Sequence, residues 1–230
     1  GGSIMQVKAV VLLSGGIDSA TAAYWAVKER GWEAHALSLN YGHKAQKELE
    51  CAAEIAKRIC ASHKVLDLSV LKEVLKSPLT DMDIKQEEND REGDSYYVVP
   101  VRNIIFLSIA TAYAESIGAE NVVIGNHLDD AKGFPDCRPE AMCAMQQVVD
   151  VASEEGKAPT LWSPWLVSAK KEIIKRGVEL GVPYEFTYSC YQDHIACGVC
   201  EACEYRYQAF LDAGLIDPIE YAVTPKHVRR

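Results

Sequence analysis

The feature that most constrains how this chain folds is a glycine-rich turn placed between an apolar run and a helix-like run. In "AVVLLSGGIDSAT" this glycine turn comprises Ser14, Gly15 and Gly16, and Ser19 follows in the first helical turn. The two glycines permit tight backbone angles and close approach of a ligand. The start of the following helix offers unpaired N–H groups and a positive dipole end, and the serines add hydroxyl donors. The glycine turn therefore predicts a cradle for a phosphate group.

Two widespread phosphate-binding motifs do not fit the glycine turn. No Lys-Ser/Thr pair follows the glycines at the spacing of a Walker A loop. The dinucleotide fingerprint G-x-G-x-x-G is also absent. The alternative interpretation is a glycine turn that only connects a strand to a helix and binds no ligand.

The N-terminal part alternates apolar runs with amphipathic runs, which is typical of an α/β protein. The Val- and Leu-rich run 8–13 predicts a strand buried on both faces, and Gly31 is the expected C-cap of the first helix. This order predicts a doubly wound parallel sheet with right-handed crossovers. The expected strands are 8–13, 33–42 and 63–69, and the expected helices are 18–31 and 43–60.

The alternation resumes after one interruption. Residues 77–98 are polar and acidic and lack apolar periodicity, so we expect a mobile surface loop that either covers the site as a lid or has no role. Ser168 or the residue before it is the expected N-cap of a late helix. These elements predict a main domain over residues 5–185 and an appended segment over residues 186–230. The expected later elements are a long helix before a strand at 121–125, a helix at 140–156, an extended segment at 160–167 and a helix at 168–181.

Charge and composition narrow the classes of function. The 230 residues carry 24 basic and 33 acidic side chains, a formal net charge of −9. Proteins that bind nucleic acid directly usually present a basic face, so we do not expect nucleic acid as a partner. The apolar runs are shorter than a membrane span, and the N-terminus does not resemble a secretory signal. We expect a cytoplasmic protein without a membrane anchor, with Gly1–Ile4 as a tag remnant ahead of a natural start at Met5.

Eight cysteines without a secretory signal are expected to be thiols rather than disulfides. Four of them, Cys190, Cys197, Cys200 and Cys203, fall within one short segment. Four thiolates at this spacing suit a single tetrahedral Zn²⁺ without an open position, which predicts a structural site that staples the C-terminal segment. An iron–sulfur cluster is the main alternative, because C-x2-C-x2-C also occurs in ferredoxins. Free buried thiols are the remaining one.

Several strings of the sequence together resemble one family. The region "VLLSGGIDSAT" resembles the PP-loop of the N-type ATP pyrophosphatases, which bind the pyrophosphate part of ATP and transfer AMP to an acceptor oxygen. Further along, "GFPDCRPE", "KKEIIKRGVELGVPYEFTYSCY" and "ACGVCEAC" follow in the order typical of the QueC family of 7-cyano-7-deazaguanine synthases. The resemblance covers nearly the whole chain, from Met5 to about Asp217.

The resemblance implies a two-stage reaction on one carbon of a deazaguanine. ATP activates the carboxylate of 7-carboxy-7-deazaguanine as an acyl adenylate, and ammonia then attacks to give an amide. A second ATP activates the amide oxygen, and loss of AMP gives the nitrile. The resemblance also implies Mg²⁺, a four-cysteine zinc site and a homodimer. Negative charge develops on phosphate oxygens in such a reaction, so N–H donors and a cation should surround them.

The family's ATP-binding loop corresponds to Ser14, Gly15, Gly16, Asp18 and Ser19 in this chain. Asp18 and Ser19 are expected to be catalytic as well as ATP-binding. An acidic side chain beside pyrophosphate either orients the loop or helps to hold Mg²⁺. The alternative for Asp18 is a role as helix N-cap alone.

Other family motifs supply the expected substrate contacts. Arg102 and Asn103 match an Arg-Asn pair, and Arg102 either holds a carboxylate or phosphate through two hydrogen bonds, in a catalytic role, or is a structural arginine. Leu39 is expected to contact ATP and Tyr41 to contact the substrate.

The motif Pro-Asp-Cys-Arg adds three more residues. Asp136 is expected to accept hydrogen bonds from the deazaguanine base, and Arg138 to face the substrate carboxylate or ATP. Cys137 between them either packs in the core or acts as a nucleophile. Adenylation needs no thiol nucleophile, so packing is favoured.

Two segments beside the expected pocket depart from the family pattern. In "YGHKA", His43 and Lys44 replace Gln and Arg, and the following His is absent. In "NHLDDAKGFPDCR", Ala131 and Lys132 replace Tyr and Ser. Lys132 is expected either to contact a phosphate or carboxylate, in a catalytic role, or to be a solvated loop lysine.

These departures leave the nucleophile open. The first hypothesis is the nitrile-forming synthase that uses ammonia. The second is a QueC-like paralogue from an anti-phage system, which couples the deazaguanine carboxylate to a protein amine and stops at the amide. A third is a non-catalytic ATP-sensing or zinc-ribbon interaction module, which the intact glycine turn, Arg-Asn pair and Pro-Asp-Cys-Arg motif disfavour. PP-loop relatives that thiolate tRNA are disfavoured by the negative net charge, and those that use glutamine by the lack of an amidotransferase domain.

Overall fold

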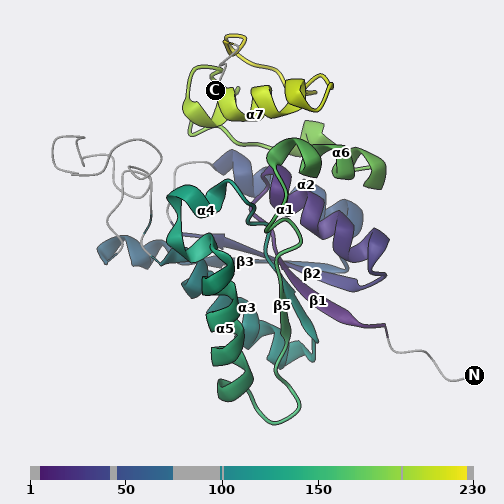
Figure 1. The fold of residues 1–230 in the computed structure, drawn as a ribbon, viewed down its shortest axis with the longest axis vertical. Helices are drawn as coiled ribbons and strands as arrows, with labels where there is room; N and C mark the ends of the chain where they lie inside the picture. The colour runs from purple at the N-terminus through teal and green to yellow at the C-terminus, as the bar shows by residue number, and fades with distance from the viewer. Residues whose placement is uncertain (1–5, 42–45, 75–98, 100, 193, 227–230) are drawn as a thin grey trace, which may run out of the picture.

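A computed structural model describes residues 6–41, 46–74, 99, 101–192 and 194–226 (Figure 1). The expected tag remnant at Gly1–Ile4, the acidic loop at 77–98 and the substituted residues His43 and Lys44 lie outside the described residues. Among the described residues, no helix combines the length and the apolar character needed to cross a membrane.

Five parallel strands form one sheet, in the order β3-β2-β1-β4-β5. Chain order reverses beside β1, which pairs with β2 on one side and with β4 on the other. This confirms the predicted α/β class with a parallel sheet. The strands are β1 Lys8–Leu12, β2 Glu33–Asn40, β3 Ser62–Asp67, β4 Asn121–Val123 and β5 Thr160–Trp162.

Helices cover both faces of the sheet, as a doubly wound fold requires (Figure 1). They include one π-helical turn, η1, and the 3₁₀ turns η2, η5 and η6. The helical elements are α1 Ile17–Tyr24, η1 Trp25–Glu29, α2 Gln46–Ile59, η2 Ser69–Glu73, α3 Arg102–Ile117, α4 Asp130–Gly133, η5 Pro135–Cys137, α5 Pro139–Ala152, α6 Lys170–Leu180, η6 Tyr184–Phe186 and α7 Glu201–Asp212.

The alternation of side chains along β1 divides the core into two layers. Ala9, Val11 and Leu13 pack with residues of α1, α2 and α6 in one cluster. Val10 and Leu12 pack with residues of α3 and α5 in the other. Successive side chains of a strand point to opposite faces, so a run apolar at every position must be covered on both sides. The prediction of a strand buried on both faces is confirmed.

Two helix boundaries differ in detail from the expectations. The first helix changes after Tyr24 to a π-helical turn, and Gly31 follows it with φ +70°, the left-handed backbone that ends helices. The expected N-cap at Ser168 or the residue before it is wrong, because the N-cap position is Ala169. The helix begins at Lys170 instead, where Ala169 N–H donates to the Glu172 carboxylate over 2.8 Å.

Candidate active site

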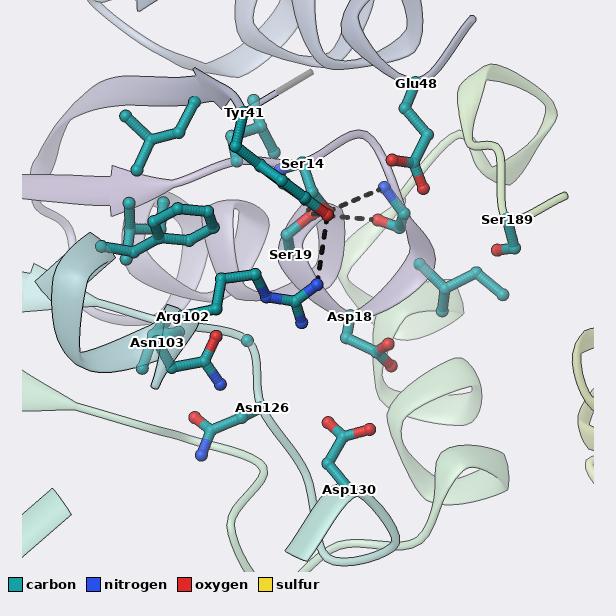
Figure 2. A pocket seen from close by; sticks show the side chains of 18 of the residues that line it. Ser14, Asp18, Ser19, Tyr41, Glu48, Arg102, Asn103, Asn126, Asp130 and Ser189 are labelled. Atoms are coloured by element: carbon teal, nitrogen blue, oxygen red, sulfur yellow. Dashed lines mark hydrogen bonds between the residues drawn. The ribbon is translucent and has the colours of Figure 1, made fainter. Parts of the chain in front are cut away.

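A cavity of about 390 Å³ opens at the carboxyl ends of β1, β2 and β4, where the strand order reverses. Open parallel sheets bind their ligands at such a switch point. The glycine turn forms one wall, and the start of α3 and the segment after β4 form another (Figure 2). The predicted residues that line it are Ser14, Gly16, Asp18, Ser19, Leu39, Tyr41, Arg102 and Asn103.

The glycine turn is held in an open loop by its own hydroxyl groups. Ser14 Oγ accepts a hydrogen bond from Gly16 N–H over 3.3 Å, and Ser19 Oγ accepts one from Ser14 N–H over 3.2 Å. Gly15 adopts φ +93°, and a Cβ there would lie 2.1 Å from the carbonyl oxygen of Glu48. Only glycine allows both the backbone angle and the close contact with α2. The turn therefore leaves its polar edge facing the cavity at the N-terminus of α1.

Asp18 does not cap this helix. The N-cap residue is Gly16, which makes no side-chain cap, and Asp18 lies in the first turn of α1. The proposed role of Asp18 as helix N-cap alone is therefore wrong. Its carboxylate forms an ion pair with Lys170, and His127 Nε2 lies 3.8 Å from its Oδ2. Its other oxygen, Oδ1, is buried without a hydrogen-bond partner among the described residues.

Asp130 faces Asp18 across the cavity floor (Figure 2). Burial, reinforced by the negative charge of Asp18, raises the pKa of Asp130. Two carboxylates turned toward each other, one with an orphaned oxygen, are a donor set that suits a hard divalent cation such as Mg²⁺. The residues present therefore fit the magnesium ion that the sequence resemblance implies.

Lys170 and His127 are functional candidates that sequence reasoning missed. Lys170 opens α6 and its side chain is only 12% exposed, while His127 follows β4 and is buried. Both lie in a second cavity of about 350 Å³, which adjoins the first along Asp18 and Asp130. In the sequence Lys170 stands in "AKKE", where a solvated helix face is the usual interpretation. Its pairing with Asp18 across 152 positions could not be found from local pattern.

Arg102 reaches into the first cavity from the start of α3. Its Nη1 donates to the phenol oxygen of Tyr41 over 3.1 Å, and the Tyr41 ring packs against Phe106 at 5.4 Å between centroids. Burial raises the pKa of Tyr41, so this phenol stays neutral. Among the described residues no carboxylate lies within ion-pair distance of Arg102, and its guanidinium lines the cavity.

The Pro-Asp-Cys-Arg motif contributes less to the cavity than the sequence suggests. Asp136 accepts a hydrogen bond from Asn103 N–H over 2.8 Å and so fixes the start of α3. Arg138 is exposed and donates to Ala131 C=O over 3.3 Å. Neither is among the residues that line the cavity, whereas Cys137 is.

Cys137 lies at the centre of a polar contact network. Asn103 Nδ2 donates to its sulfur over 2.9 Å, and Asn126 Nδ2 donates to its carbonyl over 3.0 Å. Burial raises the pKa of Cys137 to about 12, so the thiol stays protonated. A protonated buried thiol packs rather than attacks, in line with the favoured interpretation. Lys132 lies in α4, and its side chain is outside what the structure describes.

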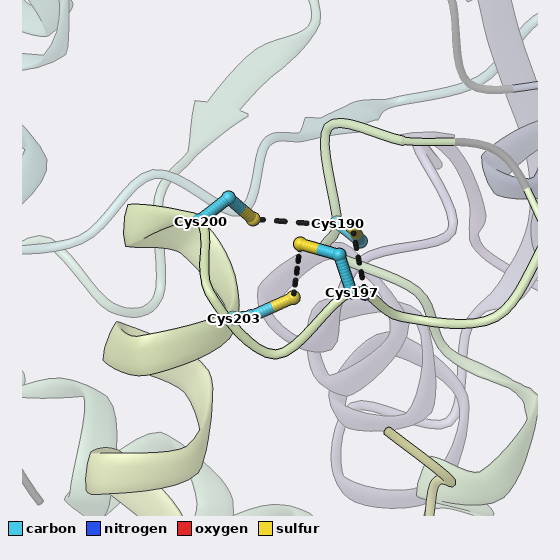
Figure 3. A group of neighbouring side chains, drawn as sticks. All are labelled: Cys190, Cys197, Cys200 and Cys203. Atoms are coloured by element: carbon cyan, nitrogen blue, oxygen red, sulfur yellow. Dashed lines mark hydrogen bonds between the residues drawn. The ribbon is translucent and has the colours of Figure 1, made fainter. Parts of the chain in front are cut away.

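The four cysteines of the C-terminal segment converge as predicted (Figure 3). Their sulfurs all lie within 4.8 Å of one another, with Cys190 to Cys200 at 3.9 Å and Cys197 to Cys203 at 4.0 Å. Tetrahedral bonds of about 2.3 Å to one zinc ion would separate sulfurs by about 3.8 Å. The geometry therefore fits a single tetrahedral metal ion.

Comparison with known proteins places the chain in a family. Residues 8–214 match the family described as "Queuosine biosynthesis protein QueC". The chain belongs to the QueC family. Its relatives include the 7-cyano-7-deazaguanine synthase of Methanosphaerula palustris, 46% identical over 94% of this chain and 99% of the relative. The same enzyme of Oceanobacillus iheyensis is 44% identical over 93% of this chain and 98% of the relative.

Solved structures of lower identity share the fold. The U34-tRNA thiolase NcsA from Methanococcus maripaludis, with its [4Fe-4S] cluster, matches with a TM-score of 0.51 at 14% identity, over 84% of this chain and 63% of that one. The NMN synthetase from Francisella tularensis matches with a TM-score of 0.50 at 20% identity, over 92% of this chain and 79% of that one. At these identities the likeness concerns the fold alone.

Proposed function

We propose that this QueC family member is a 7-cyano-7-deazaguanine synthase, which converts 7-carboxy-7-deazaguanine to the nitrile with two ATP molecules and ammonia. The observation that carries the proposal is the similarity to relatives of that name over nearly the whole chain, with 46% identity to the enzyme of Methanosphaerula palustris. The cavity at the sheet's switch point supplies the parts that the chemistry needs: an anion cradle, a carboxylate pair and the guanidinium of Arg102.

ATP would lie across the carboxyl ends of β1 and β2. The glycine turn and the hydroxyl groups of Ser14 and Ser19 would hold the pyrophosphate part, with the adenine toward Leu39. Asp18 and Asp130 would hold Mg²⁺, which supplies positive charge to the phosphate oxygens. Lys170, released from its ion pair with Asp18 when the cation binds, would then be free to pair with the departing pyrophosphate.

The deazaguanine would occupy the part of the cavity near α3, with its carboxylate on Arg102. A carboxylate oxygen attacks the α-phosphorus of ATP, and the bond to pyrophosphate breaks. Ammonia then forms the C–N bond as AMP leaves, and a proton is released. The amide oxygen attacks a second ATP in the same way. Loss of AMP and of the remaining protons on nitrogen gives the nitrile.

The four cysteines would hold a structural Zn²⁺, because four thiolates leave no open coordination position for a substrate. Cysteine ligation of this kind suits a reducing compartment such as the cytoplasm, and we expect the protein to act there, as a homodimer. Direct nucleic-acid binding is not part of the proposal, given the net charge of −9.

The alternative, transfer of the deazaguanine acyl group to a protein amine, would use the same adenylate. The relatives that match this chain are named for the nitrile-forming reaction, so they give the alternative no support. The roles of His43, Lys44 and Lys132 in choosing the nucleophile stay predictions.

One incubation tests the proposal. The protein is mixed with 7-carboxy-7-deazaguanine, ATP, Mg²⁺ and an ammonium salt, and the products are read by mass spectrometry. We expect the nitrile, with two AMP formed for each. Adenylate or AMP without any nitrile would contradict the synthase, and an amide on an added protein in its place would favour the alternative. Zinc stoichiometry is measured on the same sample, and bound iron would contradict the zinc assignment.

A further inference from the structure

Residues 187–191, which we call the strap, run from the buried core to the four cysteines and cross the glycine turn on the way. We propose that the strap positions the glycine turn for nucleotide binding, so that a metal ion held by the four cysteines sets the affinity of the turn for ATP. The inference rests on the proposed function in one respect, that the glycine turn binds ATP.

The central contact of the strap is a backbone hydrogen bond to the glycine turn. Tyr188 N–H donates to Gly15 C=O over 2.9 Å, and Tyr188 itself is only 4% exposed. On the other side, Glu48 C=O lies against the Cα of Gly15, so closely that a Cβ would be 2.1 Å away. The glycine turn is therefore held between α2 and the strap, and a shift of either one changes its shape.

The strap is anchored at its first residue by a buried ion pair. Arg206 of α7 donates to Thr187 Oγ1 over 2.9 Å and to Tyr184 C=O over 3.2 Å. The same guanidinium binds the carboxylate of Asp217 through two hydrogen bonds, at 2.7 and 2.9 Å, and both side chains are 1% exposed. This anchor consists of protein groups alone.

The second anchor lies at the other end and depends on the cysteines. Cys190 belongs to the strap, whereas Cys200 and Cys203 lie at the start of α7. The sulfur of Cys190 accepts hydrogen bonds from two backbone N–H groups, those of Gln192 at 3.3 Å and Cys197 at 3.4 Å. Bonds to a shared metal ion would tie the strap directly to α7, the helix that also carries the first anchor.

The residues between the anchors reach the active site. Ser189 and Tyr191 line both adjoining cavities, although they flank the metal-ligating Cys190 on either side (Figure 2 shows Ser189). Loss of the second anchor would let this part of the strap move relative to the glycine turn. A binding loop that is only partly in its competent conformation binds its ligand more weakly, in proportion to the competent fraction.

The test compares the full chain loaded with zinc, stripped by a chelator and reloaded with zinc. Hydrogen exchange is measured at the amides of residues 14–19, and the Kd for Mg·ATP is measured by calorimetry. On metal removal we expect faster exchange at 14–19 and about tenfold weaker ATP binding, both restored by zinc, while α5 keeps its protection. Unchanged exchange at 14–19 after verified metal loss would overturn the inference. The exchange measurement needs neither ATP nor deazaguanine, so it decides the role of the strap even if the chain makes no nitrile.

A variant that leaves every cysteine in place tests the same coupling from the first anchor. Thr187→Val keeps the shape of a fully buried side chain but removes the oxygen that accepts from Arg206. With zinc content unchanged, we expect several-fold weaker Mg·ATP binding and faster exchange at 14–19. Val149→Ala is the matched control, because it opens the opposite core layer under α5. Equal changes in Kd for both variants would show general destabilisation and would refute a specific strap.

Discussion

Replacement of Asp18 by asparagine separates the two roles that the structure gives this carboxylate. The substitution keeps the size of the side chain but removes its charge, so the ion pair with Lys170 is lost and the orphaned oxygen no longer attracts a cation. Loss of one partner costs about 3–5 kcal/mol in a fully buried ion pair, and about 0–1 kcal/mol at the surface. With exposures of 21% for Asp18 and 12% for Lys170, we expect a cost between these limits, about 2 kcal/mol.

For a domain of this size, a loss of about 2 kcal/mol lowers the melting temperature by about 4–8 °C, so the variant stays folded. The rate of pyrophosphate release should fall by about 10²–10³-fold, the usual effect of removing one group that stabilises developing charge. Melting is followed by calorimetry, and pyrophosphate by a coupled assay at saturating ATP and deazaguanine acid over a range of Mg²⁺ concentrations. The concentration of Mg²⁺ for half-maximal rate should rise.

Two further variants make this prediction decisive. Lys170→Met breaks the same ion pair but keeps the carboxylate, so it should lose similar stability. The Mg²⁺ concentration for half-maximal rate should not rise, because the cation no longer has to displace the lysine from Asp18. Asp150→Asn, on the exposed side of α5, should change neither property. If Asp18→Asn melts lower but releases pyrophosphate at the wild-type rate and with the wild-type Mg²⁺ requirement, the carboxylate only stabilises the fold, and our account of the site is wrong.

Three other substitutions probe the rest of the cavity. Arg102→Met should raise the KM for the deazaguanine acid about 100-fold and change the affinity for ATP little, because the guanidinium of Arg102 is the cation placed for the substrate carboxylate. Steady-state kinetics with each substrate varied in turn check this prediction, and equal effects on both substrates would contradict it. Cys137→Ala should keep most of the activity, because the thiol has its pKa raised to about 12 and stays protonated; an inactive variant of normal stability would indicate covalent chemistry instead. Gly15→Ala should abolish ATP binding measured by calorimetry, because the backbone of Gly15 has φ +93° and an added Cβ would lie 2.1 Å from a backbone oxygen. Gly16→Ala should weaken ATP binding far less, because no atom lies nearer than 3.5 Å to a Cβ added there. Similar losses in the two glycine variants would remove the steric argument.

The features that could be predicted from the sequence are those made by residues that lie close together in the chain. A run apolar at every position required a strand covered on both faces, and β1 is such a strand. Two glycines after it required a turn with unusual backbone angles, which Gly15 confirms. Four cysteines at metal-ligand spacing within one short segment predicted a shared site, and their sulfurs converge. In each case the residues that make the feature are close neighbours in the chain, so their geometry follows from their spacing.

The features that local pattern could not determine are contacts between distant segments. Asp18, expected to bind ATP, forms an ion pair with Lys170, which lies 152 positions away and resembled a solvated lysine in the sequence. Asp136, expected to bind the substrate, accepts a hydrogen bond from the backbone N–H of Asn103 at the start of α3. Tyr188 of the strap donates to Gly15 C=O, a contact between two residues that lie far apart in the chain. The partner of a buried polar group depends on which segments the folded chain brings beside it. The order of strand, glycines and helix therefore determined where the glycine turn lies, and tertiary packing decided which charges surround it.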